Sequence, residues 1–325
     1  MSLREALETR DVVLTGEIGP PKGIDCEELW EEAEDFRDVV SAVNVTDIQS
    51  AVMRLSPQFP FVKLKQMGIE PVLQMVCRDR NRLALQADLL GAAIWGIENI
   101  LSLTGDHTTL GDHPECKPVY DLDSVSLLVV IRSLMRGKDQ ARNRLDGAWK
   151  RVKLPPPPDD GKKKKKKKKA KFKYEGPIME KCPTFFPGAV VTPCADPLEP
   201  QIIKLEKKVE AGAKFIQTQA VYDAKQLEKF MKAASHIDVP ILAGLVMLKN
   251  VGMARFMNAN VAGVFVPDDV MKEMAAAPKG DEKKVSADIA ARLMREMKGM
   301  SKGFHLMPLG WSKPAVAAIE AAGLT

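Results

Sequence analysis

The segment IENILSLTGD, residues 97–106, shows the pattern that decides the fold. Its first seven residues are mostly branched and apolar, which is typical of a parallel strand buried on both faces. The run ends in Thr-Gly-Asp, a polar turn. A long polar loop follows, and then an amphipathic stretch at residues 124–135. Strand, polar loop and helix together make the unit from which parallel α/β folds are built.

The same unit recurs along the chain. We expect eight strands, at residues 12–18, 43–46, 71–76, 99–103, 189–192, 215–219, 241–246 and 304–309. We expect helices at residues 80–97, 124–135, 202–211, 224–234, 281–298 and 312–322. Eight alternations in 325 residues predict an α/β fold of the (β/α)8 TIM-barrel type. The alternative is an open doubly wound sheet, but the GxGxxG fingerprint expected of such a sheet is absent from the sequence.

One segment interrupts the pattern, between the helix that follows the fourth strand and the fifth strand. Residues 150–173 contain thirteen Lys or Arg and two Asp, a net charge of +11, whereas the whole chain carries +5 and its remainder therefore −6. Four prolines at 155–158 and eight lysines at 162–169 lie within it. Like charges repel and little can be buried, so we expect a disordered insert at residues 150–175. Since aromatic residues do not alternate with the lysines, a solvated loop is favoured over a nucleic-acid site.

The remaining composition suits a globular protein. With 45% hydrophobic and 28% charged residues, the chain can bury a large core, and we expect one barrel domain over residues 1–325. The first residues are charged from Arg4 onward and lack the apolar region of a signal peptide. No apolar run approaches the roughly 18 residues of a membrane span. Five scattered cysteines without a CxxC pair indicate free thiols. We therefore expect a cytoplasmic protein.

In such barrels, active sites gather at the carboxyl ends of the strands. Polar residues stand at most of these ends, and the candidates are Glu17, Thr46, Asp47, Gln74, Arg78, Thr104, Gly105, Asp106, Thr192, Gln217, Gln219 and Asn250. A carboxyl group buried at the mouth can have its pKa raised enough to serve as an acid near neutral pH.

Two of these motifs also have plain structural readings. GEIGPPKG, residues 16–23, places Glu17 before a Pro-Pro turn, which is either a site or an ordinary turn with an exposed glutamate. In LTGD, residues 103–106, Asp106 either faces a ligand or caps the next helix, although the long loop after it favours a functional role.

The strand at residues 215–219 adds two glutamines. Gln217 and Gln219 share one face of this strand, and each amide needs partners that a ligand or the protein could supply. The loop histidines His107 and His113, together with nearby aspartates, fit no standard ligand spacing, so we expect no metal site.

Taken in order, the motifs resemble those of the methylenetetrahydrofolate reductase family. GEIGPPK is similar to the family's opening motif, NVTD at 44–47 to its Val-Thr segment and LTGD to its Leu-Arg-Gly-Asp. KKVEAGAKFIQTQ at 207–219 is similar to its Lys-Val-Asp-Ala-Gly-Ala segment, which ends in Thr-Gln. The resemblance runs from about residue 11 to 324, interrupted around 137–181.

The resemblance implies an FAD across the barrel mouth and reduction of 5,10-methylenetetrahydrofolate to 5-methyltetrahydrofolate by hydride from the reduced flavin N5. It implies that Glu17 is the general acid for N10, that Asp106 stabilises the cationic iminium, and that Gln219 binds the pterin. The flavin-binding positions map onto Thr46, Gln74, Thr104, Gly105, Asp106, Tyr120, Asp121, Thr192, Gln201 and Lys208, of which Lys208 suits a phosphate.

Several flavin-binding positions depart from the family pattern. Gln74 replaces a His, Thr104 an Arg, Thr192 a Tyr and Gln201 an Asp, and Asp121 also differs in identity. A second hypothesis is therefore a flavin-free, folate-binding barrel that serves as a methyl-carrier or scaffold subunit of a one-carbon complex.

The loop at residues 111–124, GDHPECKPVYDLDS, resembles the family branch of anaerobic acetogens and sulfate reducers. This branch implies a smaller partner subunit and an electron-donor protein in place of direct reduction by NADH. The sequence leaves the oligomeric state open.

Overall fold

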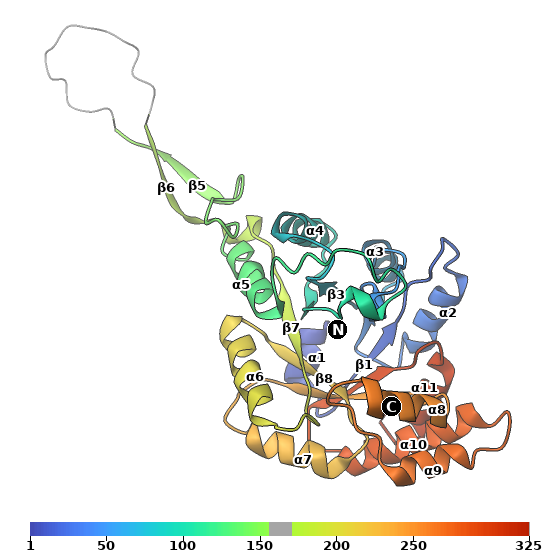
Figure 1. Cartoon of the computed structure of the whole chain (residues 1–325). Coiled ribbons are helices and arrows are strands. Elements are labelled where there is room, and N and C mark those ends of the chain that lie inside the picture. The colour runs from blue at the N-terminus through green and yellow to red at the C-terminus, as the bar shows by residue number, and fades with distance from the viewer. Residues whose placement is uncertain (156–170, 325) are drawn as a thin grey trace, which may run out of the picture.

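The computed structural model describes residues 1–155 and 171–324, in which eight parallel strands close into a barrel ringed by helices (Figure 1). In sequence order the barrel strands are β1 (Val13–Ile18), β2 (Ala42–Val45), β3 (Pro71–Val76), β4 (Asn99–Leu103), β7 (Phe186–Val191), β8 (Phe215–Ala220), β9 (Ile241–Val246) and β10 (Gly303–Met307). Each strand pairs with its neighbours in sequence, and β10 returns to pair with β1. The predicted TIM barrel and its eight strands are confirmed.

Helices cover the outside of the barrel. The six expected helices are α4 (Arg82–Ile94), α5 (Ser124–Leu134), α6 (Glu199–Ala211), α7 (Ala224–Ala233), α10 (Glu282–Met297) and α11 (Ser312–Ala321). Four more were not expected on this outer layer, namely α2 (Glu27–Phe36), α3 (Gln58–Gln66), α8 (Val251–Asn260) and α9 (Asp268–Ala275). Among the described helices, none is both long and apolar enough to cross a membrane.

A further unexpected helix, α1 (Leu3–Thr9), closes the amino-terminal end of the barrel. A capping box between Ser2 and Glu5 starts it. Its buried Leu3 and Leu7 pack with the lowest layer of inward-facing side chains, which are Val13, Ala42, Val72, Leu101, Phe186, Phe215 and Leu242. Because apolar side chains fill this end, a ligand has to enter from the other.

The inward-facing residues change from apolar to polar along the strands. Side chains alternate between the two faces of a strand, so every second residue points into the lumen. On β1 the inward series begins with Val13 in the apolar layer and continues with Thr15 and Glu17. On β8, Gln217 follows Phe215 in the same way. The polar layer therefore lies beneath the carboxyl-terminal mouth.

Both ends of the insert between α5 and β7 form strands, whereas the sequence predicted disorder. Here β5 (Trp149–Lys153) and β6 (Phe172–Pro177) form an antiparallel hairpin that projects from the barrel (Figure 1). Across it the Arg151 guanidinium lies 3.6 Å from the centre of the Phe172 ring, a cation–π contact. Disorder was therefore the wrong prediction for the strand residues within 150–175, because backbone pairing and stacking offset their charge. The lysines at 162–169 lie outside the described residues.

Candidate functional site

A cleft of about 440 Å³ opens at the carboxyl ends of the strands, within the size range of small-molecule sites. The structure brings twelve of the predicted site residues together around it: Glu17, Asp47, Gln74, Arg78, Thr104, Gly105, Asp106, Thr192, Gln201, Lys208, Gln217 and Gln219. Thr46, Tyr120, Asp121 and Asn250 are not part of its lining, and Asn250 instead caps α8. The three residues predicted to be catalytic thus share one cleft.

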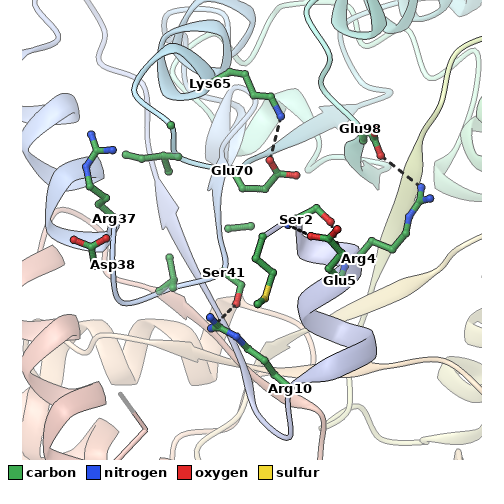
Figure 2. A pocket seen from close by; sticks show the side chains of 15 residues that line it. Ser2, Arg4, Glu5, Arg10, Arg37, Asp38, Ser41, Lys65, Glu70 and Glu98 are labelled. Carbon is green, nitrogen blue, oxygen red and sulfur yellow. Dashed lines mark hydrogen bonds and ion pairs between the residues drawn. The ribbon is translucent and has the colours of Figure 1, made fainter.

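A larger hollow, of about 760 Å³, lies beside α1 at the opposite end of the barrel (Figure 2). Four of its charged side chains form two ion pairs: Lys65 Nζ lies 3.2 Å from Glu70 Oε2, and Arg4 Nη2 lies 3.6 Å from Glu98 Oε2 (Figure 2). These ion pairs are partly exposed, and such pairs contribute little to the free energy of folding. None of the predicted site residues lines this hollow, so we assign it no function.

Glu17 is an enclosed carboxylate of the predicted site. It is the penultimate residue of β1, lines the cleft and is only 7% exposed. Gln74 Nε2, from β3, donates to Glu17 Oε2 at 2.6 Å, and Gln49 Nε2 donates to Oε1 at 3.4 Å. The reading of Glu17 as an exposed turn residue is therefore wrong. Gln74, at a position where the family has a His, donates this hydrogen bond from its amide nitrogen to the predicted acid.

His305, which the sequence analysis missed, lies beside Glu17. It is 2% exposed, and its Nε2 is 3.6 Å from Glu17 Oε2. Its Nδ1 is 2.9 Å from Thr15 Oγ1 and 3.3 Å from Gln217 Nε2. The strand sequence GFHLM contains no recognisable motif. The only sequence indication that His305 faces the lumen is its position in the alternation of inward and outward side chains along the strand.

The two glutamines of β8 differ in their surroundings. Gln217 is buried and exchanges hydrogen bonds with Asn44 at 2.8 and 3.1 Å, so its amide is satisfied within the protein. Gln219 lies where the register between β8 and β9 shifts, and such a bulge redirects a side chain. Gln219 Oε1 accepts from the Ala220 N–H at 3.0 Å, and the residue lines the cleft. Of the two, only Gln219 faces a potential ligand with a free amide nitrogen among the described residues.

The LTGD turn places Asp106 at the rim, where its side chain is exposed. Gly105 has φ +90°, a conformation that favours glycine. Arg78, only 1% exposed, donates to the carbonyl of Asp106 at 3.1 Å and to that of Ile48 at 3.0 Å. Tyr120 donates from its hydroxyl to the Gly105 carbonyl at 3.1 Å. Backbone contacts therefore fix the turn and leave the Asp106 carboxylate facing the cleft mouth.

Two lysines of α6 form the opposite wall. Lys208 Nζ donates to the Val190 carbonyl at 2.6 Å, and burial, reinforced by the neighbouring Lys204, lowers the Lys208 pKa to about 8. Lys204, which the sequence analysis did not single out, also lines the cleft. The two amines and Gln201 lie on successive turns of one helix, an arrangement that suits an anionic group.

The remaining predicted positions have structural contacts. Asp121 accepts from Arg82 Nε and Nη2 at 2.7 Å each, and this pairing lowers the Asp121 pKa to about 2. Thr46 is buried, and its hydroxyl has no hydrogen-bond partner within residues 1–155 and 171–324. In the long loop, Asp112 pairs with Lys22 at 2.5 Å. Among the described residues, no three His, Cys, Asp or Glu side chains are grouped as metal ligands.

Comparison with known proteins identifies relatives. A family model described as methylenetetrahydrofolate reductase matches residues 2–141 and 173–323. The chain is 25% identical over 268 residues to methylenetetrahydrofolate reductase 2 of Schizosaccharomyces pombe, covering 79% of this chain and 36% of that protein. The chain therefore spans about a third of the length of that relative.

Two solved structures are similar over nearly the whole chain. One is an uncharacterized protein from Clostridium thermocellum that binds two copies of 5-methyl-5,6,7,8-tetrahydrofolic acid, with a TM-score of 0.58, 14% identity, and coverage of 98% of this chain and 99% of that chain. The other is 2,3-dimethylmalate lyase, of the PEP mutase/isocitrate lyase superfamily, with a TM-score of 0.50, 11% identity, and coverage of 99% and 84%. At such identities these likenesses show the barrel fold alone. The family model matches nearly all of the chain outside the insert. The chain therefore belongs to the methylenetetrahydrofolate reductase family.

Proposed function

We propose that this chain reduces 5,10-methylenetetrahydrofolate to 5-methyltetrahydrofolate with a bound FAD, in the cytoplasm. The observation that carries the proposal is the meeting of Glu17, Asp106 and Gln219 around one cleft. The Clostridium barrel of similar fold binds 5-methyltetrahydrofolate, which is the product of this reaction. Five free cysteines suit a reducing compartment.

The residues of the cleft fit an FAD. Lys204 and Lys208 offer two amines to its phosphates. The buried Thr46 hydroxyl, without a partner in the described part of the chain, is available to a ligand beside the cleft. Small side chains at Thr104 and Thr192 leave the rim open. When bound, the flavin supplies the hydride for the methylene carbon.

The proposed chemistry of the protein is a proton transfer and the stabilisation of a cation. As the methylene bridge opens, Glu17 gives its proton to folate N10, and Gln74 and Gln49 then stabilise the carboxylate that remains. Asp106, placed at the rim, favours the positive charge that develops on the folate. The free amide nitrogen of Gln219 holds the pterin ring.

The variant Glu17→Gln tests the proposal. A neutral amide cannot deliver the N10 proton, so reoxidation of the reduced variant by methylenetetrahydrofolate should slow by about 10²–10⁴-fold in stopped-flow measurements. Flavin content and reduction of the flavin serve as internal controls and should stay close to the parent values. Reoxidation at the parent rate would remove Glu17 from the mechanism.

The flavin-free folate carrier is the second candidate. It is favoured by Gln74 and Asp121, whose side chains are engaged by Glu17 and Arg82. The visible spectrum of the purified protein separates the two candidates, because oxidised flavin is yellow and a folate-binding barrel without it is colourless.

We propose further that electrons arrive from a donor protein, with a smaller partner subunit. The support is the loop at residues 111–124, which resembles the acetogen branch. Anaerobic reduction with NADH, NADPH and reduced ferredoxin in turn tests this proposal. Rapid reduction of the isolated chain by NADH alone would contradict it.

A further inference from the structure

The hairpin of β5 and β6, together with the turn that leads into it, carries a charge opposite to that of the barrel. Residues 142–155 and 171–177 contain seven Lys or Arg and two acidic residues, a net charge of +5. The whole chain carries +5 and residues 156–170 contribute +6, which leaves −6 for the rest of the chain. Since the hairpin projects from the barrel (Figure 1), an acidic molecule is attracted to the hairpin and repelled by the barrel.

One face of the hairpin combines two arginines with two aromatic rings. Directly opposite residues of an antiparallel pair point to the same face, and Arg151 lies opposite Tyr174. Phe172 lies two residues before Tyr174 and therefore shares this face. The Arg151 guanidinium lies 3.6 Å from the centre of the Phe172 ring, and the Arg144 guanidinium lies 3.9 Å from that of Tyr174. All four side chains are exposed, and we call them the arginine face.

Stacking on the rings orders both guanidinium groups and leaves their edges open. In the part of the chain that the structure describes, neither Arg144 nor Arg151 forms an ion pair, whereas Arg82 on the barrel pairs with Asp121. A guanidinium binds a carboxylate best through two parallel hydrogen bonds. It loses less conformational entropy on binding when a ring already holds it in place. The arginine face is therefore preorganised for carboxylates.

The bases of a nucleic acid would need the same rings as platforms. Single strands bind largely by stacking their bases on open aromatic faces. Here a cation already lies over each aromatic ring of the described hairpin residues, since Lys138 Nζ also lies 5.4 Å from the centre of the Trp149 ring. The rings therefore hold cations of this chain, which favours the carboxylates of a protein over stacked bases.

We propose that the arginine face docks an acidic protein through carboxylates on that protein's surface, in a transient complex guided by charge. The family model leaves out residues 142–172, so most of this surface is an addition to the shared barrel. The face includes no residue of the cleft, and docking therefore does not depend on the proposed reduction of the folate. The basic hairpin attracts such a partner, and the acidic barrel keeps it at a distance from the rest of the chain.

Fluorescence anisotropy with a labelled decaglutamate peptide measures the affinity of the full chain for clustered carboxylates, at low and at physiological salt. The double variant Arg144→Lys/Arg151→Lys keeps the charge and loses the planar fork, so its Kd should rise roughly 10-fold. Lys150→Gln with Lys173→Gln is the matched control, because these lysines lie on the opposite face and Lys173 already pairs with Glu175. Although it removes two charges, the control should raise the Kd by less than about 3-fold.

The lysines at 162–169 also attract the peptide and have to be separated from the arginine face. Replacing residues 154–171 by Asn-Gly removes these lysines and keeps the face, and the double variant should weaken binding in this background as well. Phe172→Leu with Tyr174→Leu, which keeps the arginines and removes the stacking, should raise the Kd by a smaller factor. Thermal unfolding verifies that each variant is folded before its Kd is compared.

Four results would each overturn the proposal. The first three are a parent chain that does not bind the peptide at low salt, a double variant with the parent Kd, and a control that loses as much affinity as the double variant. The fourth is binding of a labelled deoxythymidine decamer, in the Asn-Gly background, at least as tightly as decaglutamate. That result would make the face a surface for nucleic acid.

Discussion

The carboxylate of Asp106 is held at the rim by its backbone, through Gly105 and Arg78, and so it can be changed with little effect on folding. In Asp106→Asn, hydride transfer to the folate should slow by roughly 10–10³-fold, at about 1.4 kcal/mol per factor of ten, because the cation loses a fixed negative charge. The flavin reduction potential should rise. Potentiometry and single-turnover kinetics measure both effects. Asp112→Asn, in the same loop but paired with Lys22, is the matched control and should change neither.

Lys208 gives a second prediction at the residue scale. Its pKa of about 8 means that the amine is charged below pH 8 and neutral above it. Binding of FAD, with its anionic phosphates, should therefore weaken as the pH rises from 7 to 9, and a titration by flavin fluorescence measures this. Lys208→Met should bind roughly 10-fold more weakly at pH 7 and lose most of the pH dependence. An unchanged pH profile in this variant would exclude Lys208 from the phosphate site.

Residues in recognisable motifs at strand ends could be predicted, whereas lone residues outside any motif could not. Glu17, Asp106 and Gln219 stand in recognisable segments, and the structure gathers them around one cleft. His305 and Lys204 stand in no motif and are recognised only by what lies opposite them. The contact of Gln74 with Glu17 joins residues 57 positions apart, so spacing along the chain gave no sign of it.

At the scale of elements, α2 carries an acidic group with a raised pKa. Burial, together with the charges of Glu28 and Asp35, raises the pKa of Glu32 to about 7. A carboxyl whose pKa is raised in the folded state contributes stability at low pH that is lost as the pH rises through 7. Glu32→Gln should therefore stabilise the protein by about 1–2 kcal/mol at pH 8, allowing for partial exposure, and by little near pH 4.5. Thermal unfolding at both pH values measures this.

Glu31→Gln, an exposed neighbour on α2, is the control and should leave the melting temperature nearly unchanged at both pH values. A Glu32→Gln variant that is no more stable than this control at pH 8 would contradict the assigned cause.

The strands were easier to predict than the helices and the hairpin. Barrel strands buried on both faces give continuous apolar runs, and all eight are found. By contrast, α2 buries only Leu29, Ala33 and Phe36 among acidic residues, a narrow stripe in a charged segment. The hairpin of β5 and β6 is stabilised by pairing across the insert, which composition does not reveal.

On the scale of the whole molecule, the barrel has two unlike ends. Apolar residues and α1 fill the amino-terminal end, and the polar layer leads upward to the cleft. The hairpin of β5 and β6 lies apart from both (Figure 1). The family match leaves out residues 142–172, so the shared barrel does not require them. At the base of the hairpin, Trp149 Nε1 donates to the Gly137 carbonyl at 2.7 Å, which anchors it to the loop after α5.

This arrangement predicts that the chain tolerates loss of the insert. Lys153 and Phe172 pair at the end of the hairpin, so Asn-Gly can replace residues 154–171 as a two-residue turn. The change removes nine lysines and two aspartates and takes the net charge from +5 to −2, which ion exchange can verify. The melting temperature should stay within about 2 °C of the parent, because the anchored base is kept.

Both half-reactions should keep their parent rates in this variant, since no residue lining the cleft is touched. Trp149→Ala, which removes the anchor at the base, is the comparison and should lower the melting temperature. A loss of folate reduction, or of reduction by a donor protein, in the Asn-Gly variant with its melting temperature preserved would show that the basic insert takes part in the function. In that case its charge, which reverses the sign of an otherwise acidic chain, would be what the partner recognises.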